Sequence, residues 1–377
     1  MNGRGQGIGD RVRSVIPEGM SQREFAGHLG MTPDALSRAL SGQRGFAPVE
    51  LGDVAALTGQ DLHWLISGRR DPWRLDPAAR HQWDADTGGY SNPGRVEDDE
   101  LLATLLAVYR AAYPGGPPGS PDLPGTASAV RDLLGADFVE LFSDRVEEHL
   151  GIDIIRLPRL STSYSLRVGS RGVIVLSATP NWFYSNWSLA HELGHLALGH
   201  HATESSDDIN EREANAFAAE LLLPADAMGR VHWSKATRSE VAEFLWESGV
   251  STLALRNRLT SMRLGAAAVD SLEQATQKYL RAHLPPVATG SPRVSMAQRE
   301  RQAAERRYPA ALHEDLRARV EEGEADPALL AWLLDTPVSE VDFPASDEEA
   351  AAAAYADMVR ASSAADWTGR FRSESSA

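Results

Sequence analysis

The chain has 377 residues, of which 42% are hydrophobic and 24% charged, so it is long enough for two or three ordinary globular domains. Its net charge of −16 excludes a protein that coats nucleic acid non-specifically, and any contact with DNA has to come from a local patch. The absence of cysteine excludes disulfides and thiolate metal ligands. With no apolar leader and no apolar run of about 18 residues, the sequence indicates a cytoplasmic protein without membrane contact.

Residues 8–68 are expected to form a domain of five short helices. Ser21 and Glu24 have the spacing of a capping box at the start of the second helix. Thr32 and Pro33 are suited to begin the third helix, as its N-cap and its first helical residue. Two helices joined by a short turn in this way have the spacing of a helix-turn-helix.

This part of the chain resembles helix-turn-helix domains of the Cro/lambda-repressor (XRE) type. The resemblance rests on Met-Ser-Gln-Arg-Glu-Phe-Ala at 20–26 and on Leu-Gly-Met-Thr-Pro-Asp-Ala-Leu-Ser-Arg-Ala-Leu-Ser-Gly-Gln-Arg at 29–44. It implies DNA binding through one phosphate contact and four residues facing the major groove. These residues are Gln22 for the phosphate and Thr32, Asp34, Ser37 and Arg38 for the groove. Residues 1–70 hold eight arginines against seven acidic residues, so a module for dimerisation or partner docking stays open as an alternative.

Residues 69–125 predict a linker that contains one helix. Residues 84–94 are rich in glycine, serine, asparagine and proline and contain few apolar side chains. An amphipathic helix is expected over Leu101–Tyr113, and a run of proline and glycine follows it at 114–121.

Residues 126–235 predict the catalytic core. A strand is expected over Ile152–Leu157, and the segments Tyr164–Val168 and Val173–Ser177 flank a glycine-containing turn typical of a β-hairpin. We therefore expect a small antiparallel sheet directly before the helix that follows. The exposed edge of such a sheet can hold an extended peptide by strand addition.

The next helix carries the pattern His-Glu-x-x-His. Its histidines, His191 and His195, are four residues apart and share one helix face, where both can bind one zinc ion. Glu192 is placed to act as general base on a zinc-bound water. The surrounding leucines and alanines predict a buried helix, where such polar groups are costly without a metal. His200 and His201 are expected to face solvent at the helix end.

A catalytic zinc site needs a third protein ligand, and two candidates compete. His201 follows the first histidine by ten residues, as in metzincins, but the glycine which that pattern requires is replaced by Leu198. On the following helix, Glu211 and Asn215 share one face, which suits Glu211 as ligand and Asn215 as a residue that orients a ligand. Glu213 points elsewhere and is the weaker candidate. We favour Glu211.

The two helical motifs together resemble the ImmA/IrrE family of zinc metallopeptidases over residues 126–264. They read His-Glu-Leu-Gly-His-Leu-Ala-Leu-Gly-His at 191–200 and Glu-Arg-Glu-Ala-Asn-Ala-Phe-Ala-Ala-Glu-Leu-Leu-Leu-Pro at 211–224. Leu223 stands where the family usually has methionine. The resemblance implies a gluzincin-like core that holds Zn²⁺. It also implies cytosolic cleavage of a specific partner, often a helix-turn-helix repressor, in stress response or mobile-element control.

The rest of the chain predicts helices. Residues 236–270 contain a second helix-turn-helix-like pair, in which the stretch 248–269 has three arginines and no acidic residue. Residues 271–345 are expected to form a small helical regulatory or interaction domain. The tail over 346–377 is rich in alanine, glutamate and serine and is expected to hold at most one more helix.

The expected fold class is therefore α+β: an all-α helix-turn-helix domain, a gluzincin-like metallopeptidase core and helical C-terminal domains. The expected function is a zinc endopeptidase that cleaves a regulatory protein, with DNA contacted through the first domain. A homodimer is compatible with the sequence. Two alternatives remain open: a DNA-binding transcriptional regulator whose zinc site is structural or sensory, and the toxin of a toxin–antitoxin pair.

Overall fold

The computed structural model describes residues 7–17, 19–58, 60–68, 75–79, 82–84, 89–91, 95–202, 207–264, 272–285 and 294–341. The predicted tail over 346–377 lies outside these residues. The chain forms two compact units, Met1–Arg95 with Gly115–Arg307 and Val96–Pro114 with Tyr308–Ala377. Helices and strands both occur, so the expected mixed α+β class is confirmed. None of the described helices is long and apolar enough to cross a bilayer.

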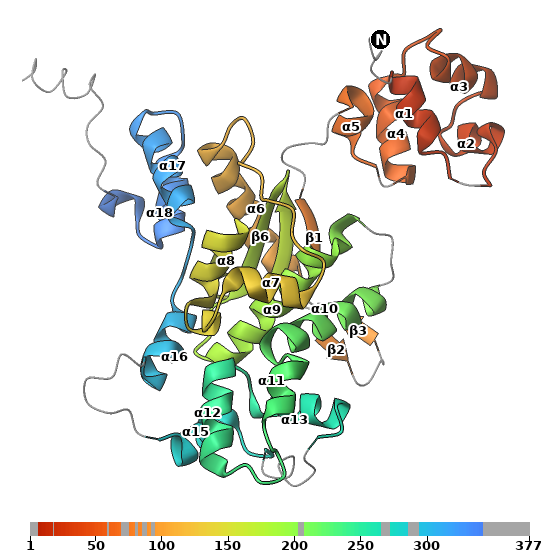
Figure 1. Cartoon of the computed structure of the whole chain (residues 1–377). Helices are drawn as coiled ribbons and strands as arrows, with labels where there is room; N and C mark the ends of the chain where they lie inside the picture. Colours follow the sequence, from red (N-terminus) through yellow and green to blue (C-terminus); the bar gives the residue numbers. More distant parts are fainter. Residues whose placement is uncertain are drawn as a thin grey trace, which may run out of the picture. The chain divides into compact units, whose positions relative to one another are not determined.

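The first five helices form a bundle around their own apolar core (Figure 1). Their bounds are Ile8–Ser14 (α1), Gln22–His28 (α2), Pro33–Leu40 (α3), Pro48–Thr58 (α4) and Leu62–Ser67 (α5). The predicted capping box is present, because the Ser21 hydroxyl accepts from the Glu24 N–H while the Glu24 carboxylate accepts from the Ser21 N–H. Phe25 on α2 and Leu36 on α3 are fully buried in this core.

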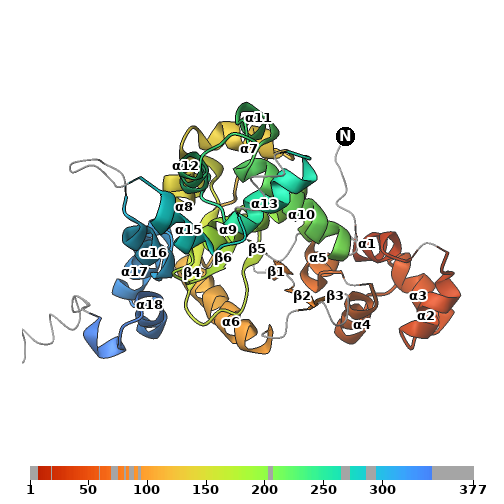
Figure 2. The same ribbon diagram turned by 90° about the horizontal axis from the view of Figure 1, so that it is seen from below.

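Four strands form a sheet in the order β1-β5-β6-β4 (Figure 2). Their bounds are Leu75–Ala79 (β1), Asp153–Leu157 (β4), Tyr164–Val168 (β5) and Arg171–Ser177 (β6). The predicted hairpin is present: β5 and β6 are antiparallel, and Gly169 supplies the positive φ of their turn. The prediction of an antiparallel sheet is wrong for β4, which pairs in parallel with β6. The reason is that β4 lies on the far side of β6 from β5, so strands that are consecutive in sequence are not neighbours.

Two long helices follow the sheet and carry the predicted metal ligands. The helical elements of this region are Ala127–Leu134 (α7), Phe138–Leu141 (η1), Phe142–Leu150 (α8), Trp182–Leu198 (α9), His200–Ala202 (η2) and Asp207–Leu222 (α10). Helix α9 packs on β5 and β6 with one face and against α10 with another. The two helices approach closely at Gly194, where an added Cβ would lie 3.2 Å from the Ala214 Cα and from the Phe217 Cβ. Glycine at this crossing lets α10 bring its polar face beside the histidines.

The segment predicted as a linker contains strands as well as its helix. Besides β1, the strands Gln82–Asp84 (β2) and Gly89–Ser91 (β3) pair with each other. Strand β1 contacts η2, and β3 contacts α10. No sequence pattern predicts β1, because aspartate, proline and alanine are poor strand formers. The strand forms because β5 offers an unpaired edge.

The remaining elements are helical, as expected. In the first unit they are Ala225–Arg230 (α11), Arg238–Ser248 (α12), Thr252–Ser261 (α13), Thr276–His283 (α15) and Met296–Ala304 (α16). In the second unit they are Arg95–Ala112 (α6), Ala310–Glu321 (α17), Pro327–Leu334 (α18) and Val338–Glu340 (η3). Helices α12 and α13 share the core that holds α9 and α10, since Leu245 and Leu255 are fully buried in it.

Candidate metal centre

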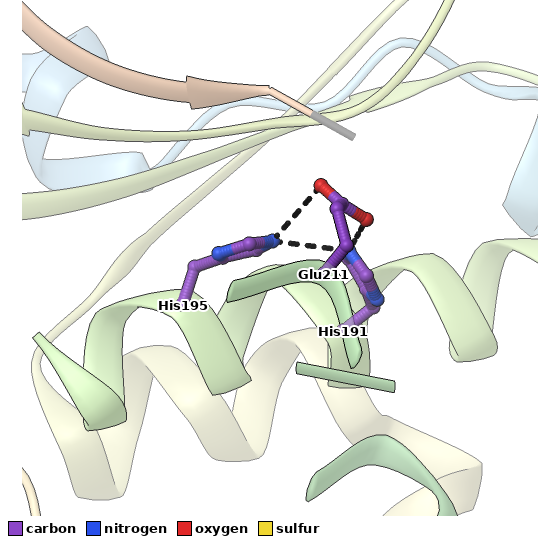
Figure 3. Close-up of side chains that lie close together, drawn as sticks. All are labelled: His191, His195 and Glu211. Atoms are coloured by element: carbon purple, nitrogen blue, oxygen red, sulfur yellow. Dashed lines mark hydrogen bonds and ion pairs between the residues drawn. The ribbon is translucent and has the colours of Figure 1, made fainter. Parts of the chain in front are cut away.

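Three buried side chains from α9 and α10 form a group that could hold a metal ion. They are His191 and His195 on α9 and Glu211 on α10, each no more than 2% exposed. Among the described residues, no other group of three or more His, Cys, Asp or Glu has its ligand atoms so close together. Figure 3 shows the two imidazoles and the carboxylate pointing toward one another.

The distances within this group fit a single small cation. The two Nε2 atoms are 3.1 Å apart, and the Glu211 oxygens lie 3.3 Å from His191 Nε2 and 3.6 Å from His195 Nε2. Donor atoms about 2.0–2.1 Å from a tetrahedral zinc ion are separated by about 3.3 Å. The donor set of two histidines and one glutamate is also one that zinc uses in catalytic sites. The residues present therefore fit zinc.

The hydrogen bond on the far side of His191 fixes its tautomer. Its Nδ1 lies 3.2 Å from the Asn215 Oδ1. Because an amide oxygen only accepts, Nδ1 carries the hydrogen, and Nε2 is left with a lone pair that faces the group. Asn215 thus has the orienting position that the sequence predicts for it.

His195 is oriented by two residues that the sequence analysis assigned otherwise. His195 Nδ1 lies 2.9 Å from His200 Nδ1, and His200 Nε2 lies 3.2 Å from the Glu213 carboxylate. Since the carboxylate accepts from Nε2–H, His200 Nδ1 accepts from His195 Nδ1–H, and His195 Nε2 keeps its lone pair for a metal. The expectation that His200 faces solvent is wrong: it is 8% exposed, because η2 folds it back under α9.

Burial of His200 also favours the neutral imidazole that this hydrogen-bond chain requires. Desolvation lowers the pKa of His200, and the neighbouring His195 lowers it further, while Glu213 acts in the opposite direction. The only sequence signal for this chain of groups was spacing, since His200 lies one short turn beyond His195 and Glu213 lies beside Glu211.

Glu192 is fully buried beside the two histidines, and among the described residues neither of its carboxylate oxygens has a hydrogen-bond partner. Burial raises the pKa of Glu192, and the nearby His191 and His195 lower it in part. The Ser165 hydroxyl on β5 is close enough to lower this pKa as well, although it does not reach hydrogen-bonding geometry with Glu192. A carboxylate that is fully buried without a partner is costly unless a further group, such as water or a cation, shares the pocket.

His201, the other candidate for the third ligand, lies away from the group. Its Nε2 donates to the carbonyl oxygen of Ser165, at 3.1 Å. It is half-buried, so the expectation that it faces solvent also fails. His201 therefore ties η2 to β5, and the carboxylate beside the two histidines comes from Glu211.

A cavity of about 1150 Å³ opens beside the metal group, between α9, α10 and α13. Its lining includes the aromatic side chains of Tyr184 and Trp187 and the polar side chains of Asn215 and Asn257. Asn215 lines the cavity and bonds His191, so the cavity adjoins the candidate centre. Its lining of apolar and aromatic side chains with a few polar groups is typical of ligand-binding clefts.

The five candidate DNA-contact residues are all exposed, on α2, α3 and the residue that caps α3. They are Gln22, Thr32, Asp34, Ser37 and Arg38. The Thr32 hydroxyl accepts from the Ala35 N–H as the cap of α3, and Arg38 pairs with Asp34 at 2.8 Å.

Comparison with known proteins identifies one family in this chain. A family model described as IrrE N-terminal-like domain (Peptidase_M78) matches residues 147–260, which include β4 to α12 and the whole metal group. No curated protein and no solved structure matches the chain. The family match supports the ImmA/IrrE resemblance for this segment, which carries the candidate metal centre.

Proposed function

We propose that this protein is a cytoplasmic zinc-dependent endopeptidase fused to an N-terminal DNA-binding module, and that it hydrolyses a peptide bond in a specific regulatory protein, a transcriptional repressor. The observation that carries the proposal is the buried group of His191, His195 and Glu211 with Glu192 beside it, whose carboxylate has no hydrogen-bond partner in the described part of the chain. The family match over this segment supports it independently. Stress response and the control of mobile elements or toxin–antitoxin pairs are the settings in which such an enzyme acts.

The ligand set favours catalysis over a structural or sensory role for zinc. Structural zinc sites are closed by four protein ligands, whereas catalytic sites have three and leave one position for water. Among the described residues the group contains three ligands. A transcriptional regulator with a structural zinc site remains the second candidate, and the exposed residues of α2 and α3 are the observation that favours it.

Glu192, Asn215 and His200 have different roles in the proposed hydrolysis. When bound, zinc polarises the scissile carbonyl and acidifies water. Glu192 takes a proton from the attacking water and delivers it to the nitrogen of the leaving amine. Asn215 and His200 hold the two imidazoles in the tautomer that presents Nε2. Burial raises the pKa of Glu192, which favours the protonated form from which a proton can pass to the leaving amine.

Substitution of the proposed base tests the function directly. We expect Glu192→Gln to retain zinc and the fold but to lower hydrolysis of an unstructured test protein, β-casein, by about 10²–10⁴-fold. The matched control is Glu148→Gln, which removes an exposed carboxylate on α8 and should leave the rate unchanged. Full hydrolysis by the zinc-loaded Glu192→Gln protein would contradict the proposal and favour the structural or sensory role.

A further inference from the structure

The cavity between α9, α10 and α13 begins at the residues that surround His191. Trp187 and Tyr184 line it and precede His191 on α9 by four and seven residues, so they share the helix face that carries this histidine. On α10 the lining includes Asn215, whose Oδ1 lies 3.2 Å from His191 Nδ1. The cavity is therefore continuous with the surroundings of the metal group and extends from there toward the N-terminal end of α9.

Aromatic and small side chains face this cavity together. The aromatic side chains are Phe183, Tyr184 and Trp187. Because Ala216 and Ala219 of α10 each contribute only a methyl group, the space beside the aromatic rings stays open. Leu253 of α13 also belongs to the lining and is 53% exposed, so an apolar side chain faces water there. With about 1150 Å³, the cavity exceeds the roughly 300–1,000 Å³ of a small-molecule site and has room for several residues of a peptide.

The side of the cavity formed by α13 is basic. Arg256 and Arg258 both line it, and Arg258 forms an ion pair with Glu220. Arg256 is partly exposed and forms no ion pair with any of the described residues. Among the described residues of the lining, Glu273 is the only acidic one, and its exposed carboxylate is screened by water. Arg256 thus presents a positive charge to whatever enters the cavity.

These features define the peptide that fits. Aromatic rings and a leucine that face an open space gain most from burial of a large apolar side chain. A guanidinium group binds a carboxylate through paired hydrogen bonds, so Arg256 favours an acidic side chain. Because Asn215 both lines the cavity and bonds a proposed metal ligand, a side chain in the cavity belongs to a residue close to the bond under attack.

We propose that this cavity selects the substrate: the enzyme cuts beside an aromatic or large aliphatic side chain that enters the cavity, in a segment that also carries an acidic side chain for Arg256. The inference rests on the proposed function and names its substrate class. Tyr184, Trp187 and Arg256 act as binding residues, which contact the substrate and take no part in breaking the bond. The aromatic wall selects the residue beside the bond, and the arginine selects the charge of the segment.

The test uses the full-length, zinc-loaded protein and a library of synthetic decapeptides with random central residues. Mass spectrometry locates the cut bonds. We expect bonds next to Phe, Tyr, Trp or Leu, always on the same side of the bond, to be cut about 10²-fold faster than bonds next to Ala. Peptides with Asp or Glu in the same half should be cut about tenfold faster than peptides with Lys there.

Filling the cavity from α10 tests the apolar preference. Ala219→Trp places a large side chain in the space beside the aromatic rings, and we expect the preference over alanine to fall from about 10²-fold to less than about threefold. The matched control is Ala225→Trp, which adds the same side chain at an exposed position of α11 outside the lining and should keep the wild-type preference. Metal analysis shows whether both variants retain zinc.

Reversing the charge on α13 tests the second preference. Arg256→Glu should invert the charge preference, so that peptides with Lys are cut about tenfold faster than peptides with Asp or Glu. The matched control is Arg263→Glu, which makes the same charge change at an exposed residue directly after α13 and outside the lining. It should keep the wild-type preference. Both substitutions are at positions that contact water, so this test does not depend on the room inside the cavity.

The library separates failure of this inference from failure of the proposed function. A wild-type protein that cuts peptides without preference for apolar side chains overturns the inference and leaves the endopeptidase assignment standing. A zinc-loaded protein that cuts neither the peptides nor β-casein overturns both. An apolar preference unchanged by Ala219→Trp, or a charge preference unchanged by Arg256→Glu, contradicts the assignment of selection to this cavity.

Discussion

The three candidate metal ligands on α9 and α10 are buried and contact one another, whereas the candidate DNA-contact side chains of α2, α3 and the α3 cap are all exposed. His191 and His195 each have a polar partner that fixes the tautomer, from Asn215 and His200. The exposed Arg38 pairs with Asp34, one helical turn away on the same helix. Each region was predicted from a short motif, but burial surrounds the motif in α9 with specific neighbours.

Burial explains why the structure indicates function more strongly in one region than in the other. A buried polar group has to be satisfied, so its partners constrain its chemistry strongly. An exposed side chain forms hydrogen bonds with water and keeps several rotamers. Its role in DNA binding is therefore predicted from its position on the helix alone. The candidate metal centre is therefore supported by contacts between its residues, whereas the proposed DNA-binding surface rests on the helix-turn-helix resemblance.

The largest expected effect is on metal content. We expect Glu211→Ala to lower bound zinc from about one ion per chain to none, because it removes one of three ligands. His201→Ala should retain zinc, since His201 bonds the Ser165 carbonyl and lies outside the group. Metal analysis of the dialysed proteins measures both. Loss of zinc from the His201→Ala protein with retention in the Glu211→Ala protein would reverse the assignment.

A smaller effect is expected from the residues behind His195. His200→Gln should weaken zinc affinity by about 10–100-fold, because it removes the partner that fixes the His195 tautomer. Glu213 bonds His200 and does not contact His195, so Glu213→Gln should also weaken zinc affinity, but by less than His200→Gln. Titration against a competing chelator measures the affinity, with the exposed His149→Gln as control. Equal affinity for His200→Gln and the control would make His200 a packing residue only.

The crossing of α9 and α10 predicts an effect on stability. Gly194→Ala places a methyl group 3.2 Å from Ala214 and Phe217, and we expect it to destabilise the fold by about 1–3 kcal/mol. Gly229→Ala on α11 meets no atom within 4 Å and should stabilise by up to about 1 kcal/mol. Urea unfolding followed by tryptophan fluorescence compares them. If the urea midpoint of the Gly194→Ala protein equals or exceeds the wild-type value, the crossing of α9 and α10 accommodates a methyl group without strain.

The smallest effect on stability is expected at the exposed surface of α3. Arg38→Ala breaks only the exposed pair with Asp34 and should change the free energy of unfolding by less than about 0.5 kcal/mol. Its binding to DNA should nevertheless weaken by about tenfold. The control is Arg110→Ala, which removes the same charge from an exposed position on α6. Equal binding by both variants in gel-shift assays would favour a docking role for this module.

Local sequence rules predicted much of the fold and the core of the site. The Ser21–Glu24 capping box, the hairpin turn at Gly169 and the four-residue spacing of His191 and His195 each depend on neighbours in sequence. The position of Glu211 followed from the face that it shares with Asn215 on α10. In each case a short stretch of chain contains the whole physical cause.

The features that the sequence did not reveal depend on distant partners. Strand β4 pairs in parallel with β6 because of the order in which strands join the sheet, which local patterning does not encode. Strand β1 forms on the free edge of β5 against its own weak propensity. His200 turns inward because η2 brings it to both His195 and Glu213, which no single helix pattern contains.

The pairing of β1 with β5 also sets a condition for any other peptide that would use the same edge. Because β1 is tethered to its sheet, its local concentration there depends on the length of chain on either side and not on the amount of protein in the cell. A visiting peptide has to displace this resident competitor before it can pair with β5. Only a peptide that binds β5 tightly enough to displace β1 can therefore pair with this edge. The affinity it needs does not change with the amount of protein in the cell.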